Sequence, residues 1–268
     1  MKATASWRES LPVLLRALKL PGFAAGADEM TQRTEKEGLS FPVALHHLAE
    51  QELAERARKR ITRLMKGSGL PAEKTLATLD LAKLPEKVRH QLPSLSEGNF
   101  LSDAVNILAF GLPGRGKTHA VCAIGHELVN RGHKVLFTPA YRLVQRLLRA
   151  KRDLALEAEM KKLDNYDAVI LDDIGYIQQD RNEMEVLFTF LAERYERKSV
   201  IITSNLVFSQ WDKIFTDPMT TAAAIDRIVH HSVILDFSNE SERANAAKQR
   251  ARSATSKNKG EEPPKPKE

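Results

Sequence analysis

A glycine-rich run near the middle of the chain has the composition of a phosphate-binding loop. Residues 111–118 match the pattern G-x-x-x-x-G-K-[ST]. Glycines let backbone N–H groups turn inward around phosphate oxygens, and the start of a following helix adds partial positive charge. The predicted nucleotide-binding residues are Gly111, Leu112, Pro113, Gly114, Arg115, Gly116, Lys117 and Thr118.

Two side chains of this loop have predicted chemical roles. We expect the ammonium of Lys117 to reach the β- and γ-phosphates of ATP, and the hydroxyl of Thr118 to ligate Mg²⁺. The three glycines are not spaced as G-x-G-x-x-G, which argues against a dinucleotide site. A glycine-rich turn with an incidental lysine is the alternative interpretation.

Two adjacent carboxylates follow an apolar run further along the chain. Residues 168–171 are Ala-Val-Ile-Leu, and Asp172 and Asp173 come next. A buried parallel strand would deliver both acids to the carboxyl edge of a sheet, beside the loop. We expect Asp172 to act on the Mg²⁺ shell and Asp173 to orient or deprotonate an attacking water. In the alternative interpretation, Asp172 and Asp173 only end the strand and cap the helix that follows.

A third polar group ends another apolar run. Residues 199–205 read Ser-Val-Ile-Ile-Thr-Ser-Asn, and Asn205 is placed to hydrogen-bond the attacking water or the γ-phosphate. Thr203 is a weaker candidate for the same role. In the alternative interpretation, Asn205 only stabilises the turn at the end of the strand.

The elements that must position these groups form a β/α alternation. Short β-branched runs are separated by segments with helical patterning, which predicts an α/β fold with a five-stranded parallel sheet covered on both faces. The predicted strands are Val105–Phe110, Lys134–Thr138, Ala168–Leu171, Ser199–Thr203 and Ser232–Phe237.

The remainder of the chain divides into three parts around this core, which we place at residues 104–240. Residues 1–69 are predicted to be a small helical N-terminal domain, with one helix from an N-cap at Ser40 to about Lys66. Residues 70–103 have no clean period and are expected to be a linker. Residues 241–268 are basic and poor in large apolar side chains, so we expect a disordered tail.

Charge and cysteine content narrow the class of protein. The net charge of +6 lies mostly in the N-terminal third and the tail, which suggests a polyanionic partner. A lone Cys122 cannot form an internal disulfide, and no uncharged apolar run is long enough to cross a bilayer. We therefore expect a cytoplasmic protein.

The motifs together resemble one family, the IstB-like AAA+ ATPases that help insertion sequences transpose, which are relatives of DnaC-type helicase loaders. The resemblance lies in residues 111–118, 172–176, 203–205 and 224–231, and in the opening segment 18–23. It implies an ATP-dependent homo-oligomer that binds double-stranded DNA, remodels it and activates a cognate transposase. A DnaC-like replicative helicase loader is the alternative function.

The resemblance also implies a residue that acts in trans and reveals one departure. In the family ATP lies between subunits, and Arg227 matches the arginine that touches a neighbour's γ-phosphate, a contact worth roughly 10³–10⁵ in rate. A local ion pair of Arg227 with Asp226 or Glu240 is the alternative. Most AAA+ proteins have Asp-Glu where this chain has Asp172-Asp173, so we expect slow hydrolysis. A nucleotide-binding scaffold with negligible turnover is the alternative.

Two basic stripes are candidates for DNA contact. Arg142, Arg146 and Arg149 share one face of a predicted helix that follows the second strand, where related initiators carry a DNA-binding insertion. The second stripe contains Arg56, Lys59, Arg60 and Arg63, and it is a candidate for contact either with DNA or with the transposase. Few aromatic residues are available for stacking, which favours phosphate contacts to duplex DNA. A merely solvated face is the alternative for both stripes.

The histidines do not suggest a metal site in addition to Mg²⁺. His46-His47, His119, His126 and His230-His231 show no convincing ligand set in the sequence. Cys122 is expected to be a small buried residue of the helix behind the loop.

Overall fold

The computed structural model describes residues 6–174, 181–206 and 228–238. Its contacts divide the chain into two compact units, each described separately below. One comprises Met1–Ser68 with Val129–His133, and the other comprises Gly69–Leu128 with Lys134–Glu268. The predicted tail and Arg227 lie outside the described residues.

A five-stranded parallel sheet forms the centre of the second unit. The strands are β1 (Asn106–Phe110), β2 (Val135–Pro139), β3 (Ala168–Asp172), β4 (Ser199–Ser204) and β5 (Ser232–Asp236). Their order is β2-β3-β4-β1-β5, and every neighbouring pair is parallel. The predicted α/β sheet is therefore confirmed. In this order β1, which precedes the glycine-rich loop, lies between β4 and β5.

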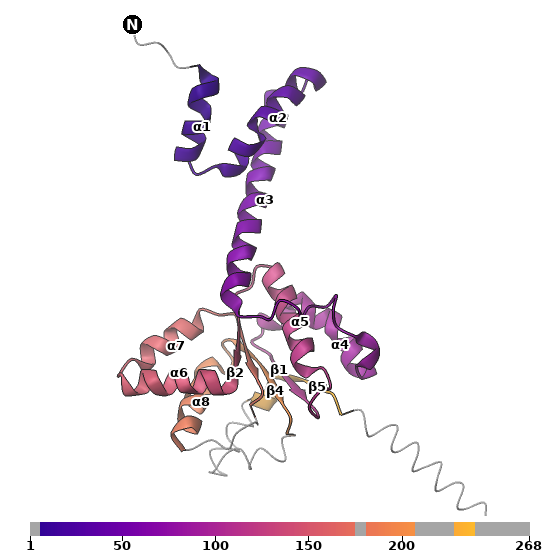
Figure 1. Ribbon diagram of the computed structural model, residues 1–268, viewed down its shortest axis with the longest axis vertical. Helices are drawn as coiled ribbons and strands as arrows, with labels where there is room; N and C mark the ends of the chain where they lie inside the picture. The colour runs from indigo at the N-terminus through magenta and orange to yellow at the C-terminus, as the bar shows by residue number, and fades with distance from the viewer. Residues whose placement is uncertain (1–5, 175–180, 207–227, 239–268) are drawn as a thin grey trace, which may run out of the picture. The chain divides into compact units, whose positions relative to one another are not determined.

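Helices cover both faces of this sheet (Figure 1). On one side lie α6 (Ala140–Arg152), α7 (Leu156–Asp164) and α8 (Arg181–Arg194), and on the other lie α4 (Glu86–Glu97) and α5 (Lys117–Asn130). Side chains of successive strand residues point to opposite faces of the sheet, so each strand contributes to the packing on both faces. Leu108 and Leu171 belong to the cluster with α6 and α8, while a Cβ on Gly125 of α5 would meet Ile170 at 2.8 Å.

The segment 70–103 is more ordered than the linker expected from the sequence. It contains α4 and the short helices η1 (Leu81–Lys83) and η2 (Asn99–Leu101), and it belongs to the same compact unit as the sheet. Val88, Leu92 and Leu95 of α4 are buried. Pro85 precedes this helix, and Gly98 closes it in the left-handed conformation that favours glycine. The helical repeat of apolar residues in α4 extends over only about three turns, which gives a weak signal in the sequence.

The first unit is helical, as predicted. It contains α1 (Trp7–Ala17), α2 (Pro21–Glu37) and α3 (Phe41–Ser68). Pro21 occupies the first turn of α2, where a missing N–H costs nothing. Although α3 has 28 residues, neither it nor any other described helix is apolar enough along its length to cross a membrane.

Close packing of α2 on α3 depends on glycine at position 22. A Cβ at Gly22 would lie 2.6 Å from Cα of Glu52, which is backbone and cannot move alone. The buried Glu52 carboxylate also accepts a hydrogen bond from the Gly22 N–H at 2.6 Å, so α3 supplies a cap for the first turn of α2. At Gly26 a Cβ would meet only the side chain of Gln51.

Gly22→Ala should therefore destabilise the first unit by about 1–3 kcal/mol, the usual cost of overpacking. Gly26→Ala is the matched control, because a flexible glutamine can move aside and the helix gains about 0.5–1 kcal/mol of propensity. Hydrogen exchange of the α2 and α3 amides measures the effect within this unit. Equal protection in both variants would contradict the close approach.

Candidate nucleotide-binding site

The predicted phosphate loop connects β1 to α5. Gly114 and Gly116 have φ angles of 75° and 91°, in the region that favours glycine, and α5 begins at Lys117. Gly111 has φ of 143°, and a Cβ there would lie 2.8 Å from Cβ of Phe237, so glycine is needed for space as well. The loop lines a pocket of about 390 Å³. A helix N-terminus that opens into a pocket is suited to an anion.

Lys117 is held at the base of this pocket. Its side chain is buried, and Nζ donates to the carbonyl oxygens of Gly111 at 2.5 Å and Leu112 at 2.9 Å and to Oδ1 of Asn205 at 2.7 Å. Burial lowers the pKa of the Lys117 ammonium, and the carboxylates of Asp173 and Asp172 oppose that shift. Three hydrogen bonds thus fix the position of the ammonium.

Asp172 and Thr118 come together as predicted for a magnesium site. Oδ1 of Asp172, at the end of β3, accepts hydrogen bonds from the hydroxyls of Thr118 and Thr203, each at 2.7 Å. Hydroxyl and carboxylate oxygens are the ligands that Mg²⁺ prefers. Thr118 and Asp172 therefore fit the predicted metal, and Thr203 orients the carboxylate from the neighbouring strand.

Asp173 lies beside them in an unusual backbone conformation. Its φ is 62°, and its N–H donates to Oγ1 of Thr203 at 2.8 Å. Its carboxylate accepts from the Asn205 amide at 2.9 Å. Burial and the neighbouring Asp172 charge raise the pKa of Asp173, and Lys117 opposes the shift. A raised pKa suits a group that must accept a proton.

Asn205 connects the two halves of the site. Its carbonyl oxygen accepts from Lys117 and its amide donates to Asp173, so both ends of one side chain are used. Asn205 follows β4, which lies between β1 and β3 in the sheet. That strand order explains how residues 88 positions apart in the chain become hydrogen-bonded.

Two residues that line the pocket were missed by the sequence analysis. Lys74 comes from the segment expected to be a linker, and His119 follows Thr118 on α5. Nε2 of His119 lies 3.1 Å from both the carbonyl oxygen of Thr75 and the hydroxyl of Thr78. These contacts attach the segment of Lys74 to α5. No local pattern in the sequence marks either residue.

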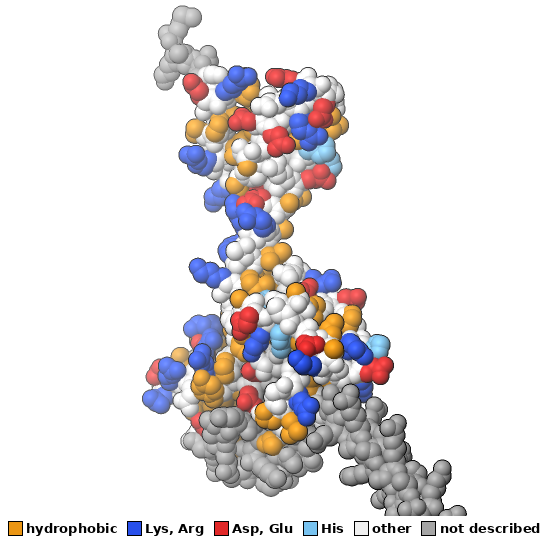
Figure 2. Space-filling model, turned by 45° about the vertical axis from the view of Figure 1, so that its right-hand side comes forward, with side chains coloured by type: hydrophobic (Ala, Val, Ile, Leu, Met, Phe, Trp, Pro, Cys, Tyr) orange, Lys and Arg blue, Asp and Glu red, His pale blue; other side chains and the backbone are white. Residues whose placement is uncertain are grey.

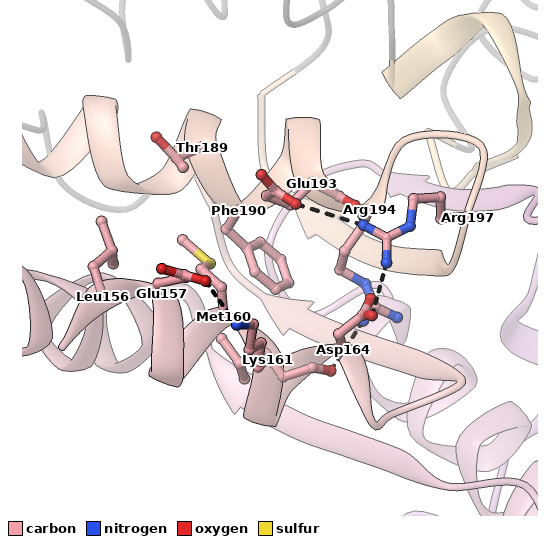
Figure 3. A pocket seen from close by; sticks show the side chains of 11 residues that line it. Leu156, Glu157, Met160, Lys161, Asp164, Thr189, Phe190, Glu193, Arg194 and Arg197 are labelled. Carbon is pink, nitrogen blue, oxygen red and sulfur yellow. Dashed lines mark hydrogen bonds and ion pairs between the residues drawn. The ribbon is translucent and has the colours of Figure 1, made fainter.

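A larger pocket, of about 730 Å³, lies between α7 and α8 (Figure 3). Its rim carries ion pairs of Lys161 with Glu157 at 2.7 Å and of Arg197 with Asp164 at 2.8 Å. The buried guanidinium of Arg194 donates to four backbone carbonyl oxygens, and burial lowers its pKa to about 10. Because this pocket has neither the glycine-rich loop nor the paired aspartates, the candidate nucleotide site is the smaller pocket.

The first basic stripe lies on α6. Leu143, Val144 and Leu147 are buried, so this side of the helix faces the core. Arg142 and Arg149 are exposed, whereas Arg146 is half-buried and its Nε donates to Glu159 of α7. Arg142 and Arg149 are thus the more accessible members of the stripe.

The second basic stripe lies on α3 of the first unit. Its four members are exposed, and two of them are ion-paired within the helix, Arg56 with Glu52 at 2.6 Å and Lys59 with Glu55 at 3.2 Å. The other members are Arg60 and Arg63. Figure 2 shows positive and negative side chains interspersed on the face in view.

Cys122 is a buried residue of α5, as predicted. Its side chain is fully enclosed, and burial raises the pKa of its thiol to about 12. Because the thiolate is the reactive form, this thiol is suited to packing rather than to nucleophilic chemistry.

The fold and the pocket define a P-loop ATPase of the AAA+ type. The sequence model of one family, described as IstB-like ATP binding protein, matches residues 13–251, and the chain belongs to that family. An insertion sequence ATP-binding protein of Sinorhizobium fredii is 40% identical over 238 residues, which cover 88% of this chain and 80% of the relative. The corresponding IS21 protein of Pseudomonas aeruginosa is 34% identical, over 87% of this chain and 88% of its own length.

Solved structures agree on the fold. DnaI is similar with a TM-score of 0.53 at 20% identity, over 63% of this chain and 95% of that protein. AMPPCP-bound DnaA from Aquifex aeolicus has a TM-score of 0.54 at 19% identity, over 74% of this chain and 58% of DnaA. The likeness to DnaA thus concerns little more than half of that protein.

Proposed function

We propose that this ATPase is a DNA-binding helper of transposition that oligomerises on DNA, remodels target DNA and activates a partner transposase. Membership of the IstB-like family over residues 13–251 is the observation that carries the proposal, since relatives across most of the chain are named for insertion sequences. The pocket that the glycine-rich loop lines supports the proposal, because ATP hydrolysis there would supply the energy that such a helper needs.

In this proposal each pocket residue has one task. Lys117 binds the β- and γ-phosphates while the N–H groups of the loop surround them. Thr118 and Asp172 would hold Mg²⁺, which when bound neutralises phosphate charge. Asp173 accepts the proton of the attacking water, and Asn205 positions that water or the γ-phosphate. Arg227, which lies outside the described residues, is proposed to complete the site of a neighbouring subunit.

The α6 stripe is proposed to contact DNA phosphates. A double variant, Arg142→Ala with Arg149→Ala, should weaken binding to unrelated duplexes alike and reduce the salt slope by about one per lost contact. Arg146→Ala should have a smaller effect, because Arg146 is already paired with Glu159. Fluorescence anisotropy at several salt concentrations measures both quantities, with the exposed Arg89→Ala of α4 as control. A salt slope unchanged in the double variant would assign the DNA contact to another surface, the α3 stripe being the next candidate.

Assembly and partner choice need a separate experiment. We expect ATP and duplex DNA together to convert the protein to a larger species in light scattering, and Arg227→Ala to suppress hydrolysis in that species but not ATP binding. Pull-down with the cognate transposase should succeed. Capture of the replicative helicase alone would contradict the proposal and favour the helicase-loader alternative.

A further inference from the structure

Two histidines and a glutamate, residue types that can ligate metals, meet at the amino-terminal edge of the sheet, away from the nucleotide pocket. Glu196 lies in the turn between α8 and β4, and His230 and His231 immediately precede β5. The loop and the aspartates lie at the opposite, carboxyl ends of the strands. Five-residue strands separate the two edges by about 16 Å, at roughly 3.3 Å per residue.

The backbone fixes these residues near one another. β4 and β5 lie on either side of β1, whose first residue is the buried Asn106. Its side-chain oxygen accepts from the Val200 N–H at 2.8 Å, and its own N–H donates to the carbonyl oxygen of His231 at 2.7 Å. Asn106 thus links the starts of both strands, from which Glu196 and the histidines project.

The three side chains already approach one another. One ligand atom from each lies within 4.8 Å of the others, and Nε2 of His231 is 3.8 Å from Oε1 of Glu196. Ligands about 2.0–2.2 Å from a tetrahedral metal are about 3.3–3.5 Å apart, so shifts of about 1 Å would close the set. Both His231 and Glu196 have accessible side chains that permit such shifts.

Glu196 is in a backbone conformation that would favour another residue. Its φ is 55°, a region that glycine, asparagine and aspartate occupy more readily than glutamate does. The turn is held by hydrogen bonds from the N–H groups of Arg197 and Lys198 to the carbonyl oxygen of Arg194, each at 3.0 Å. Glycine would fit this backbone at least as well as glutamate, so the carboxylate can be removed without straining the turn.

The neighbouring cations are directed to other acids. Arg197 pairs with Asp164 at 2.8 Å, and Lys198 pairs with Asp167 at 3.3 Å. Glu196 instead faces the imidazole of His231. Two imidazoles and one carboxylate form a set that suits zinc and similar transition metals rather than Mg²⁺.

We propose that Glu196, His230 and His231 bind a transition-metal dication such as Zn²⁺, with the remaining position open to water. The ligand that sequence reasoning lacked for the His230-His231 pair comes from a turn 34 residues earlier in the chain. The metal would join the start of β5 to the turn before β4. This site neither includes nor requires the nucleotide pocket.

The test is a titration of the full chain with Zn²⁺ in excess Mg²⁺, without nucleotide, read by a chromogenic competitor. One equivalent should bind, and Glu196→Gly, His230→Ala and His231→Ala should each weaken it by at least about 10- to 100-fold, the loss typical of even an outer-shell partner. Glu196→Gly is the most informative variant, because glycine suits the observed φ and should not impair folding. Its Tm without metal should equal or exceed that of the parent, while the rise in Tm caused by Zn²⁺ should disappear.

The chain contains a matched control. His46 and His47 form another adjacent pair, and each approaches Glu50 on α3, at 3.5 Å and 3.6 Å. His46→Ala with His47→Ala removes as many imidazoles but should leave the Zn²⁺ affinity unchanged. Loss of binding in this control, or parental affinity in Glu196→Gly, would overturn the assignment.

Discussion

Replacing Lys117 with alanine is expected to weaken ATP binding by at least about 100-fold. Hydrogen bonds to charged groups contribute about 1.5–3 kcal/mol each, and two phosphate contacts together exceed the 2.7 kcal/mol or so that corresponds to a factor of 100. The three N–H groups of the buried ammonium are donated to Asn205 and two loop carbonyls, so negatively charged phosphate oxygens would replace some of these neutral acceptors. Titration of a fluorescent ATP analogue measures the change.

The control for this experiment is Arg115→Ala, in the same loop. Arg115 is exposed, and its replacement leaves the backbone N–H cradle intact, so its effect should be much smaller. Circular dichroism should show both variants folded. If Lys117→Ala binds ATP like the parent, the nucleotide binds at another site. The proposed role of this pocket in an ATP-dependent function would then be wrong.

Replacing Asp173 with asparagine should lower the rate of ATP hydrolysis by about 10²–10⁴-fold, the usual contribution of a general base, and leave ATP binding intact. Asparagine keeps the size of the side chain and an oxygen for the Asn205 amide. Phosphate release measures the rate, and the exposed Asp103→Asn serves as control. Parental hydrolysis in Asp173→Asn would exclude Asp173 as the base.

The raised pKa of Asp173 predicts how the rate of ATP hydrolysis depends on pH. Burial and Asp172 raise the pKa of Asp173, so kcat/KM should fall on acidification already above the ordinary aspartate range. If the parent shows no measurable hydrolysis, and Asp173→Asn binds DNA as well as the parent, the nucleotide-binding scaffold is the better description.

Strands and loop motifs were predictable because their signals are local. All five predicted strands are present, with ends that differ by at most one residue. The contacts that complete the site are not local. Lys74 reaches the pocket from a segment without a clear period, and Arg146 finds Glu159 on the next helix. Such partners depend on how helices pack after the chain folds, and no spacing in the sequence reports that packing.

The wrong expectation in the fold has a similar cause. Residues 70–103 were expected to be a linker because their apolar positions follow no long repeat. They instead form short helices whose apolar side chains are buried in the unit of the sheet. Burial of Val88 and Leu92 is a tertiary property, and single-sequence periodicity indicates it only in longer helices.

The left-handed backbone at Asp173 limits how this ATPase could evolve or be engineered. Aspartate and asparagine tolerate positive φ several-fold better than other residues, so the shorter acid matches the turn that follows β3. A single exchange to the Asp-Glu pair common in AAA+ proteins would place a longer side chain on a backbone that disfavours it. We therefore expect Asp173→Glu to disturb the turn after β3 as well as to lengthen the carboxylate, so that the choice of acid and the shape of this turn depend on each other.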